Sequence, residues 1–484
     1  MTPEGDKIGD VPAGALRAEL HRMADWIADY REHIGDRRIV PDVAPGDVAR
    51  AFPSHMPETA APLSEIIDTL DQGIMPGITH WGHPAFLGYF GSTSNGPALL
   101  GEMAAAALNV SAMTWKTSPA ATELETVVLS WIRDLIGLPP SFDGVVYDTA
   151  SIAILHALAA ARERALGDVR RRGLLDRTDA PTLRVYASDQ AHSSVEKAMV
   201  MLGLGEENVV RIGTDDAFAA DVDGMRTAME RDVALGARPM AVVATVGTTS
   251  TASIDPVRAL ADLAARHGAW LHVDAAYGGA LGALPEARAP MDGVALADSV
   301  VVNPHKWLFV PLDFSALYLR DRSALSDVFA NTPEYLAGDA ARGSDVVNYM
   351  DFGVQLGRRF RALKAWAAFN TFGRAGIEAR IREHCRLAQA FGAWVRASPG
   401  FELSAPVSMG IVCFRSIRSG EAPHAADERN RRIVERVNAS GTVFLTHTSL
   451  RGRTCMRVGF GNIATTEAHA LRAWNVIVEA SGGD

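Results

Sequence analysis

The sequence predicts a protein of the α/β class, in which helices cover both faces of a mostly parallel sheet. Apolar runs with the length of buried strands occur at residues 144–147, 183–186, 209–212, 240–246, 270–273 and 299–302. Helical patterns follow three of these runs, at about 152–166, 193–202 and 256–267. Strands that are apolar throughout and alternate with helices are typical of parallel sheets buried on both faces.

The ends of one helix ahead of the sheet are clearly marked. Ser118 can cap its first turn, Pro119 suits the first helical position, and Gly137 ends it. We expect its buried stripe to consist of Val127, Val128, Trp131, Ile132 and Leu135.

The chain divides into three predicted parts: a helical segment at 1–95, a large domain at 96–375 and a small α+β domain at 376–484. The first part has helical patterns at 14–34 and 63–72. It is interpreted either as an arm that wraps a partner subunit or as a simple extension.

The small domain is expected to hold helices at 377–396 and 465–479 and strands at 410–414, 442–446 and 454–460. Residues 327–352 show neither the helical nor the strand periodicity of hydrophobic residues. A loop of that length is typical of an active-site lid, although disorder without function would give the same pattern.

Composition narrows the function. The chain has 484 residues, 48% of them hydrophobic, and can bury a sizeable core. Its net charge of −10 argues against nucleic acid and anionic membranes as partners. The first 14 residues do not resemble a secretory signal, and no apolar run has the length of a membrane span. Three widely spaced cysteines, Cys385, Cys413 and Cys455, fit core positions in a reduced, cytoplasmic setting.

A metal site is not expected. His80 and His83 are three residues apart, but no convincing third ligand follows them. The sequence also lacks a nucleophile elbow and a glycine-rich nucleotide loop.

Polar side chains follow five of the predicted strands. The five segments are Asp148–Ser151, Asp189–Ser194, Gly247–Ser250, Asp274–Tyr277 and Asn303–Trp307. Because ligands of open α/β sheets bind beyond the carboxyl ends of the strands, we expect these segments to share one crevice. The crevice would combine hydroxyl groups, an imidazole, a carboxylate and an amine.

That combination suits pyridoxal phosphate (PLP), which needs a lysine for its aldehyde, a carboxylate for its pyridine nitrogen and donors at a helix start for its phosphate. Each residue alone has an ordinary explanation. Asp274 could cap a turn, His192 could be a surface or core histidine, Ser151 could cap a helix and Lys306 could be solvated. Their order along the chain and their shared position favour the functional interpretation. The chain has only five lysines, which makes Lys306 more notable.

Several of these segments resemble the aromatic-L-amino-acid decarboxylases, the group II PLP-dependent decarboxylases. The cofactor-lysine motif is similar to Asn303–Trp307. Similar segments surround His83–Pro84, Ser118–Glu125, Asp189–Glu196, His272–Tyr277 and Leu356–Arg361, and the resemblance runs from about residue 15 to the C-terminus. It implies an aminotransferase-like fold of type I and an obligate homodimer with shared active sites, in which Leu356 and the loop at 327–352 lie near the neighbour's site.

The resemblance also implies roles for individual residues. Lys306 would form the Schiff base with PLP, Asp274 would pair with the pyridine nitrogen and His192 would stack on the ring. The remaining cofactor contacts would come from Ala150, Ser151, Thr249, Asn303, His305 and Leu356. Tyr335 would protonate the substrate alpha carbon after carbon dioxide leaves. The substrate pocket would be lined by Trp81, Tyr89, Phe90, Ser92, Ser111 and Met113.

This sequence departs from the family pattern near the cofactor and in the substrate pocket. Asp148 and Thr149 replace small residues, Gly91 replaces a proline, and Ser111 and Met113 replace larger side chains. These changes suggest a roomier or more polar pocket and leave the substrate open among tyrosine, phenylalanine, tryptophan and dihydroxyphenylalanine.

Other functions stay open. An aldehyde synthase of the same family would carry phenylalanine at the position of Tyr335. An aminotransferase would need an arginine for the alpha-carboxylate, and no sequence motif marks one. A decarboxylase of a non-aromatic amino acid such as glutamate would need further cationic residues. A non-catalytic dimer that keeps PLP as a structural ligand would have no use for Tyr335.

Overall fold

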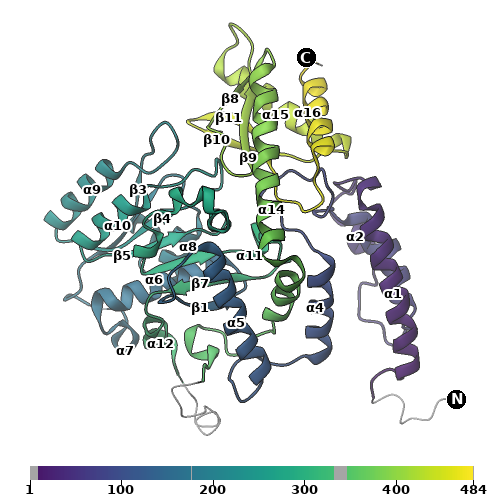
Figure 1. Cartoon of the computed structure of the whole chain (residues 1–484), viewed down its shortest axis with the longest axis horizontal. Helices are drawn as coiled ribbons and strands as arrows, with labels where there is room; N and C mark the ends of the chain where they lie inside the picture. Colours follow the sequence, from purple (N-terminus) through teal and green to yellow (C-terminus); the bar gives the residue numbers. More distant parts are fainter. Residues whose placement is uncertain (1–8, 176, 332–345, 483–484) are drawn as a thin grey trace.

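The computed structural model describes residues 9–175, 177–331 and 346–482. Figure 1 shows a large sheet flanked by helices, a smaller sheet with its own helices above it, and the N-terminal helix α1 running along one side. The mostly parallel large sheet agrees with the aminotransferase-like architecture expected from the sequence.

The large sheet has seven strands in the order β1-β7-β6-β5-β4-β2-β3. Their bounds are Asp143–Tyr147 (β1), Leu183–Ser188 (β2), Val209–Ile212 (β3), Arg238–Thr245 (β4), Trp270–Asp274 (β5), Ser299–Val302 (β6) and Ser315–Leu319 (β7). Strands β2 to β6 are paired in parallel, and β7 runs antiparallel to both β1 and β6. The six predicted strands are confirmed, whereas β7 was not predicted. Because β1 and β6 both oppose β7, their carboxyl ends lie at the same edge of the sheet.

Helices pack on both faces of this sheet. They are α5 (Pro119–Ile136), α6 (Ala150–Leu166), α8 (Ser194–Met201), α9 (Val222–Ala234), α10 (Val257–Arg266) and α12 (Ser323–Phe329). Helix α6 packs against β4 to β7 on one side and against α8 and α12 on the other, which explains why every residue from 153 to 161 is buried. The start of α6 therefore lies at the carboxyl edge of the sheet.

Helix α5 begins and ends as predicted. The Ser118 Oγ accepts a hydrogen bond from the Ala121 N–H at 3.3 Å, and Gly137 ends the helix with φ of 80°. Its predicted buried stripe is correct for Val128, Ile132 and Leu135 and wrong for two other members. Val127 and Trp131, one turn apart on the outward face, are 40% and 39% exposed.

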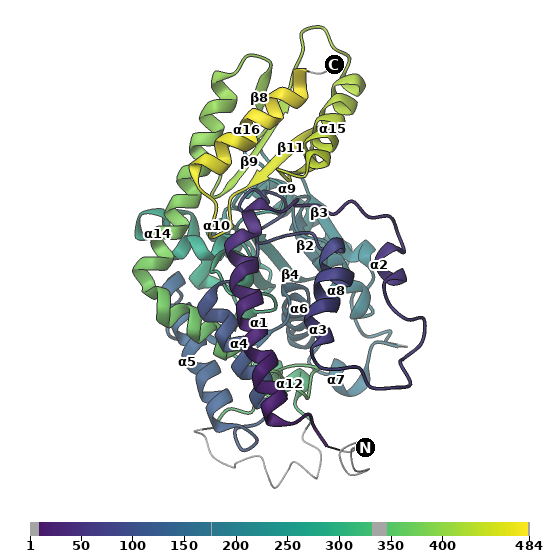
Figure 2. The same ribbon diagram turned by 90° about the vertical axis from the view of Figure 1, so that its right-hand side faces the viewer.

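The smaller sheet is antiparallel, with the order β10-β11-β9-β8. Its strands are β8 (Phe401–Leu403), β9 (Ile411–Ser416), β10 (Thr446–Leu450) and β11 (Arg453–Gly459), and its helices are α14 (Ala362–Ala397), α15 (Pro423–Ser440) and α16 (Glu467–Gly482). Figure 2 shows these helices beside the small sheet. Helix α14 passes through the domain boundary expected at 375/376 and is interrupted at Gly373, whose φ is 62°.

The strand predicted at 442–446 is wrong in position, because β10 begins only at Thr446. The backbone of Phe444 instead pairs with the N-terminal part of the chain. Its N–H donates to the Ala85 carbonyl at 3.1 Å, and its carbonyl accepts from the Leu87 N–H at 2.8 Å. The segment around residues 85–87 is thereby fixed to the small domain.

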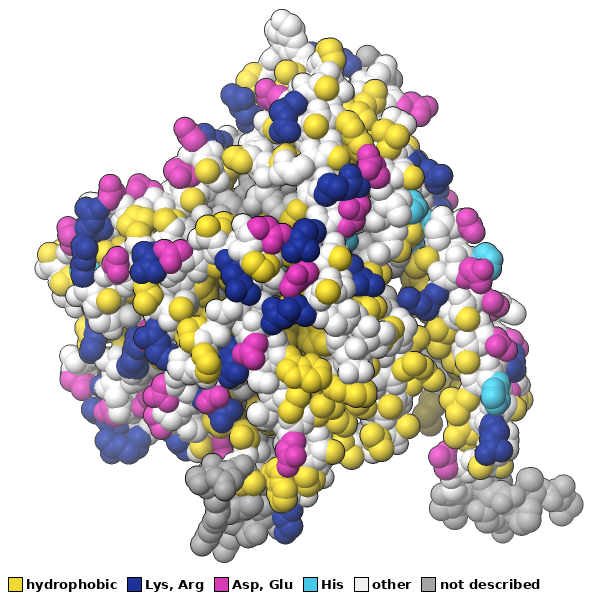
Figure 3. All heavy atoms as spheres, in the orientation of Figure 1, with side chains coloured by type: hydrophobic (Ala, Val, Ile, Leu, Met, Phe, Trp, Pro, Cys, Tyr) yellow, Lys and Arg dark blue, Asp and Glu magenta, His cyan; other side chains and the backbone are white. Residues whose placement is uncertain are grey.

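The N-terminal part is helical and largely exposed. Helix α1 (Ala13–His33) has no buried residue, and the predicted helix at 63–72 forms as α3 (Glu65–Thr69) followed by a turn of π-helix at Leu70–Ile74. Helix α4 (Gly96–Leu108) exposes Leu100, Met103 and Leu108. In Figure 3 hydrophobic side chains gather over the region of α4 and α5, beside α1. Among the described residues, no helix combines the length and the hydropathy that a membrane-spanning segment needs.

Six histidines of the described residues are buried: His80, His83, His156, His272, His305 and His384. Burial lowers the pKa of His156, His272 and His384 to about 4 and that of His305 to about 3. Burial also raises the pKa of the Asp255 carboxyl to about 6. A raised carboxyl pKa stabilises the folded state in acid, whereas the lowered pKa values of the histidines destabilise it. The buried histidines outnumber the carboxyls whose pKa burial raises, which among the described residues are Asp255 and Asp351.

The free energy of unfolding should therefore fall as the pH decreases from about 6.5 to about 4. In this range the unfolded chain binds protons on these histidines and the folded chain does not, so acid favours unfolding. Between pH 7 and pH 5 we expect a loss of at least a few kcal/mol in urea titrations of the cofactor-free protein. Equal stability at the two pH values would contradict this assignment.

Candidate active site

A cavity of about 190 Å³ lies at the carboxyl edge of the large sheet. It is lined by residues that follow five strands and by one segment from the N-terminal part: Phe90, Thr149, Ala150, Ser151, His192, Thr245, Gly247, Thr249, Asp274, Ala276, Tyr277, Asn303 and Lys306. The expectation that the strand-end segments share one crevice is confirmed for these residues.

One wall of the cavity is the start of helix α6. Thr149 is its N-cap residue, but the Thr149 side chain makes no capping hydrogen bond. The first-turn N–H groups near Ala150 and Ser151 are therefore not occupied by that side chain. The positive end of a 17-residue helix with accessible donors is suited to binding a phosphate.

Asp274 supplies a carboxylate on the cavity wall. It is the last residue of β5 and is buried, and its Oδ1 accepts a hydrogen bond from the Ala276 N–H at 3.1 Å. The neighbouring Thr245 on β4 pairs with it across the strands, and the Thr245 Oγ1 is buried without a hydrogen-bond partner among the described residues. Buried hydroxyls are rarely left unpaired, so a polar ligand atom is expected here.

Asn303 and Lys306 come from the turn after β6. The Asn303 Oδ1 accepts from the Ser315 Oγ at 2.6 Å, which leaves its Nδ2 as the donor for a ligand. Lys306 lies in the short helix α11 (Pro304–Trp307), with its Nζ 4.9 Å from the centroid of the Phe90 ring. Burial lowers the pKa of Lys306, opposed by Asp274 and reinforced by Arg457. A lysine with a lowered pKa is a better nucleophile toward an aldehyde.

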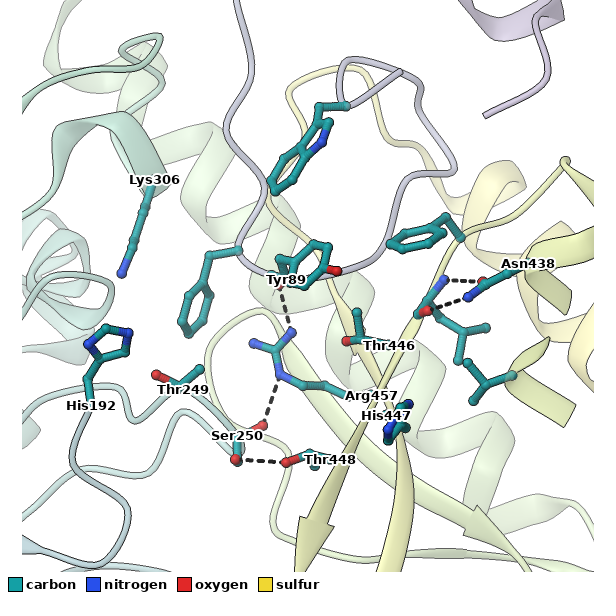
Figure 4. Close-up of a pocket in the computed structure, with 15 residues that line it drawn as sticks. Tyr89, His192, Thr249, Ser250, Lys306, Asn438, Thr446, His447, Thr448 and Arg457 are labelled. Carbon is teal, nitrogen blue, oxygen red and sulfur yellow. Dashed lines mark hydrogen bonds between the residues drawn. The ribbon is translucent and has the colours of Figure 1, made fainter. Parts of the chain in front are cut away.

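His192 and Thr249 border both this cavity and the larger pocket next to it. The His192 Nδ1 accepts the Ser194 backbone N–H at 3.1 Å, so the neutral ring carries its proton on Nε2. Partial removal from water lowers the pKa of His192, opposed by Asp274, and so favours the neutral ring. Figure 4 shows His192, Thr249 and Lys306 on the same side of the pocket.

The larger pocket has a volume of about 710 Å³ and an aromatic wall. Trp81 and Tyr89 stack with ring centroids 5.3 Å apart, and Phe90 stacks on Tyr277 at 4.0 Å. Beyond them the pocket is lined by residues of the small domain and its helix α15, namely Val434, Asn438, Phe444, Leu445, Thr446, His447, Thr448 and Arg457. The wall offers flat apolar surfaces with several hydroxyl groups at its far end.

Arg457 is a pocket residue that sequence reasoning missed. It lies on β11, where its Nε donates to the Ser250 carbonyl at 3.0 Å and its Nη1 to the Tyr89 carbonyl at 2.7 Å. Its Nη2 is buried and has no hydrogen-bond partner among the described residues, and the guanidinium lies 4.8 Å from the Phe90 centroid. The contacts to Ser250 and Tyr89 are drawn in Figure 4. Its strand, Arg453–Gly459, also contains Arg453 and Thr454, so the sequence pattern alone does not mark Arg457 as a site residue.

Some expected site residues lie elsewhere in the chain. Ser92 and His305 do not line either pocket. His305 is buried beside β7, where its Nδ1 accepts the Phe314 N–H at 3.0 Å. Tyr335 lies outside the described residues. The described part of the chain contains no group of three or more His, Cys, Asp or Glu side chains that could hold a metal ion.

Ser111, Met113 and Leu356 also lie away from both pockets, but they share one region. The Ala112 N–H donates to the Arg358 carbonyl at 2.8 Å, and the Met350 N–H donates to the Met113 carbonyl at 3.0 Å. A buried ion pair between Arg358 and Glu125, 2.6 Å, anchors the two segments to α5. Leu356 projects from this region and is 43% exposed.

Comparison with known proteins agrees with this geometry. Residues 45–417 match the pyridoxal-dependent decarboxylase conserved domain. The chain is 38% identical to phenylacetaldehyde synthase of Arabidopsis thaliana, covering 98% of this chain and 97% of that protein, and 38% identical to aromatic-L-amino-acid decarboxylase of Bos taurus, covering 96% of each. A crystal structure of Oryza sativa TDC with PLP and tryptamine superimposes with a TM-score of 0.94 at 36% identity, covering 98% of this chain and 99% of that one. The chain belongs to the pyridoxal-dependent decarboxylase family.

Proposed function

We propose that the protein binds PLP and converts an aromatic L-amino acid into the corresponding amine and carbon dioxide. The observation that carries this proposal is the shared cavity, where Lys306, Asp274 and the open first turn of α6 meet and from which an aromatic-lined pocket extends. The names of the relatives support it, since they include tyrosine, tryptophan and aromatic-L-amino-acid decarboxylases.

The cavity fits PLP on its own chemistry. Lys306 would bind the aldehyde carbon, and Asp274 would face the pyridine nitrogen. The phosphate would be held by the donors of Ala150, Ser151 and Asn303, with His192 against the ring and Thr249 beside it. The unpartnered Thr245 Oγ1 next to Asp274 is a further polar contact available to the cofactor.

When bound, the protonated pyridine ring supplies an electron sink for the bond to the departing carboxylate. Asp274 would keep the proton on the pyridine nitrogen, because a buried carboxylate beside that nitrogen favours its protonated form. Burial lowers the pKa of Lys306, which favours proton exchange between its amine and the groups beside the substrate nitrogen. Tyr335 is proposed as the general acid that delivers a proton to the alpha carbon.

Arg457 is proposed as the binding partner of the substrate carboxylate. Its Nη2 is a buried cationic donor without a partner among the described residues, and charge-assisted hydrogen bonds to carboxylates are strong. Such a contact exists before the carbon–carbon bond breaks, so it would mainly increase substrate affinity. An arginine in this pocket removes one argument against an aminotransferase, but the family match favours loss of carbon dioxide.

The aromatic wall supports an aromatic substrate over glutamate. Trp81, Tyr89 and Phe90 present ring faces to the pocket, and Arg457 is the one guanidinium among the described residues that line it. Within the described part of the chain, a second carboxylate would find no second arginine in this pocket. Aldehyde synthases among the relatives make that reaction the alternative, and the tyrosine at position 335 favours simple decarboxylation.

We also propose a homodimer with shared active sites in the cytoplasm. Helix α1 buries none of its residues within one chain, and apolar side chains of α4 are exposed beside it. A second copy covering this face would remove that surface from water. It would also bring Ser111, Met113 and Leu356, which do not reach the pocket of their own chain, toward the pocket of the partner. The three reduced cysteines agree with a cytoplasmic setting.

Incubation with PLP and a panel of amino acids tests the proposed reaction. We expect carbon dioxide and the matching amine from at least one of tyrosine, phenylalanine, tryptophan and dihydroxyphenylalanine, identified by mass. Glutamate should react at least about tenfold less efficiently, because the energy of one unpaired buried carboxylate exceeds about 1.4 kcal/mol. The variant Lys306→Ala should lose turnover. No carbon dioxide from any aromatic amino acid would refute the proposal.

The product of Tyr335→Phe tests the alternative. Without the phenolic proton donor, reprotonation of the alpha carbon slows, and oxygen can compete for the electron-rich carbon. We expect a shift from amine toward aldehyde with ammonia and hydrogen peroxide, measured by product mass and a peroxidase-coupled assay. An unchanged yield of amine in this variant would remove Tyr335 from the mechanism.

Mixing two inactive variants tests the shared sites. Lys306→Ala lacks the amine in its own pocket, and Leu356→Asp places a charge where the partner's pocket is expected. After joint refolding, half of the dimers combine both chains and keep one intact site, so about a quarter of wild-type activity should return. Equilibrium sedimentation should show a dimer. A monomer, or full activity of Leu356→Asp alone, would contradict shared sites.

A further inference from the structure

One buried histidine outside the pocket connects three distant segments of the chain. His384 lies on α14 and is 3% exposed. Its Nδ1 is 2.9 Å from the Trp307 Nε1, and its Nε2 is 3.0 Å from the Asn462 carbonyl oxygen. Trp307 directly follows Lys306, and Asn462 lies in the small domain just after β11.

These contacts determine which ring nitrogen carries the proton. The indole N–H of Trp307 can only donate, so the Nδ1 of His384 must accept. The neutral ring then carries its proton on Nε2 and donates it to the Asn462 carbonyl. Both partners are satisfied by one tautomer of a neutral ring, and no leucine or phenylalanine could replace both bonds.

The link continues to the aromatic wall of the pocket. The Asn462 Nδ2 donates to the His83 carbonyl at 2.9 Å and lies 3.4 Å from the Trp81 carbonyl. On the other side, Trp307 stacks on Tyr277 at 4.7 Å, and Tyr277 stacks on Phe90 at 4.0 Å. The turn that carries Lys306 and the segment that carries Trp81 and Phe90 are thus joined by His384 on one side and by stacked rings on the other.

We propose that His384 is a positioning residue for decarboxylation, which holds the Lys306 turn in register with the aromatic wall through its bonds to Trp307 and Asn462. It does not line the pocket and touches no reacting atom. Its contribution is geometric. Lys306 and the aromatic residues at 81–90, which would contact the substrate ring, lie more than 200 residues apart in the sequence. The inference rests on the proposed decarboxylation.

Removing both bonds should impair turnover. In the holoenzyme His384→Leu should lower kcat/KM by about tenfold or more, because displacements on the order of 1 Å at a reacting group can cost about 100-fold in rate. Trp307→Phe keeps the ring stack and removes only the indole donor. We expect it to show a smaller loss of the same kind.

A double-mutant cycle isolates the bond between the two side chains. If Trp307 and His384 act through one hydrogen bond, the double variant should be no more than about twofold worse than the poorer single variant. The same non-additivity should appear in the urea midpoint of the cofactor-free proteins, a readout that does not need activity. Losses that multiply in both measurements would overturn the proposal.

His384→Asn separates the two halves of the link. Asparagine can place an acceptor near the Nδ1 position for Trp307, but it is too short to reach the Asn462 carbonyl. We expect kcat to return to within about threefold of wild type while KM stays raised, because the Lys306 turn is restored and the wall at residues 81–90 is not. If His384→Asn and His384→Leu had the same kcat and the same KM, that result would count against a positioning role.

Tyr186→Phe is the matched control. It removes one buried hydrogen bond, from the Tyr186 hydroxyl to the Asp232 Oδ2 at 3.0 Å, between β2 and α9. It should lower stability and leave kcat and KM within about twofold of wild type. Wild-type kinetics in His384→Leu would overturn the inference. A wild-type protein that releases no carbon dioxide would instead refute the proposed function. The double-mutant cycle measured by urea unfolding would still test the hydrogen bond in that case.

Discussion

The site depends on the parallel arrangement of the large sheet. Because β1, β2, β4, β5 and β6 point the same way, the residues that follow them meet at one edge. That arrangement places a helix start, a carboxylate and an amine around a cavity of about 190 Å³. The chemistry of the cofactor needs these three groups together, and none of them would be notable at separate places on the surface.

The small domain supplies part of the pocket wall. Its strand β11 carries Arg457, whose bonds to Ser250 and Tyr89 join the loop after β4 to the N-terminal segment. Its backbone at Phe444 pairs with residues 85 and 87, so the aromatic wall is built on the small domain as much as on the large one. A change in the relative position of the two domains would therefore alter the substrate pocket directly. His384 bonds to Trp307 of the large domain and to Asn462 of the small domain, so it helps to hold the two domains in one relative position.

Much of the large domain could be predicted from hydrophobic pattern, since its strands are buried on both faces and read as continuous apolar runs. Strand β7 was not predicted, because its five residues, Ser315–Leu319, follow the apolar residues Trp307–Val310 closely and do not stand out as a separate apolar run. The strand-end rule located Lys306, Asp274 and Ser151. It could not find Arg457, because a charge within a strand is recognisable as a site residue only once its neighbours are known. Resemblance suggested Ser111, Met113 and Leu356, which lie away from both pockets of this chain, and it placed Leu356 near the site of a neighbouring subunit.

The central claim is that the amine of Lys306 binds the cofactor covalently. Borohydride reduction of the PLP-loaded protein, followed by peptide mapping with mass spectrometry, tests it most directly, because reduction makes the bond between lysine and cofactor permanent. The account predicts one pyridoxyl adduct, on the peptide that contains Lys306, among the five lysines of the chain. An adduct on Lys7, Lys116, Lys197 or Lys364 instead, or no adduct at all, would contradict it.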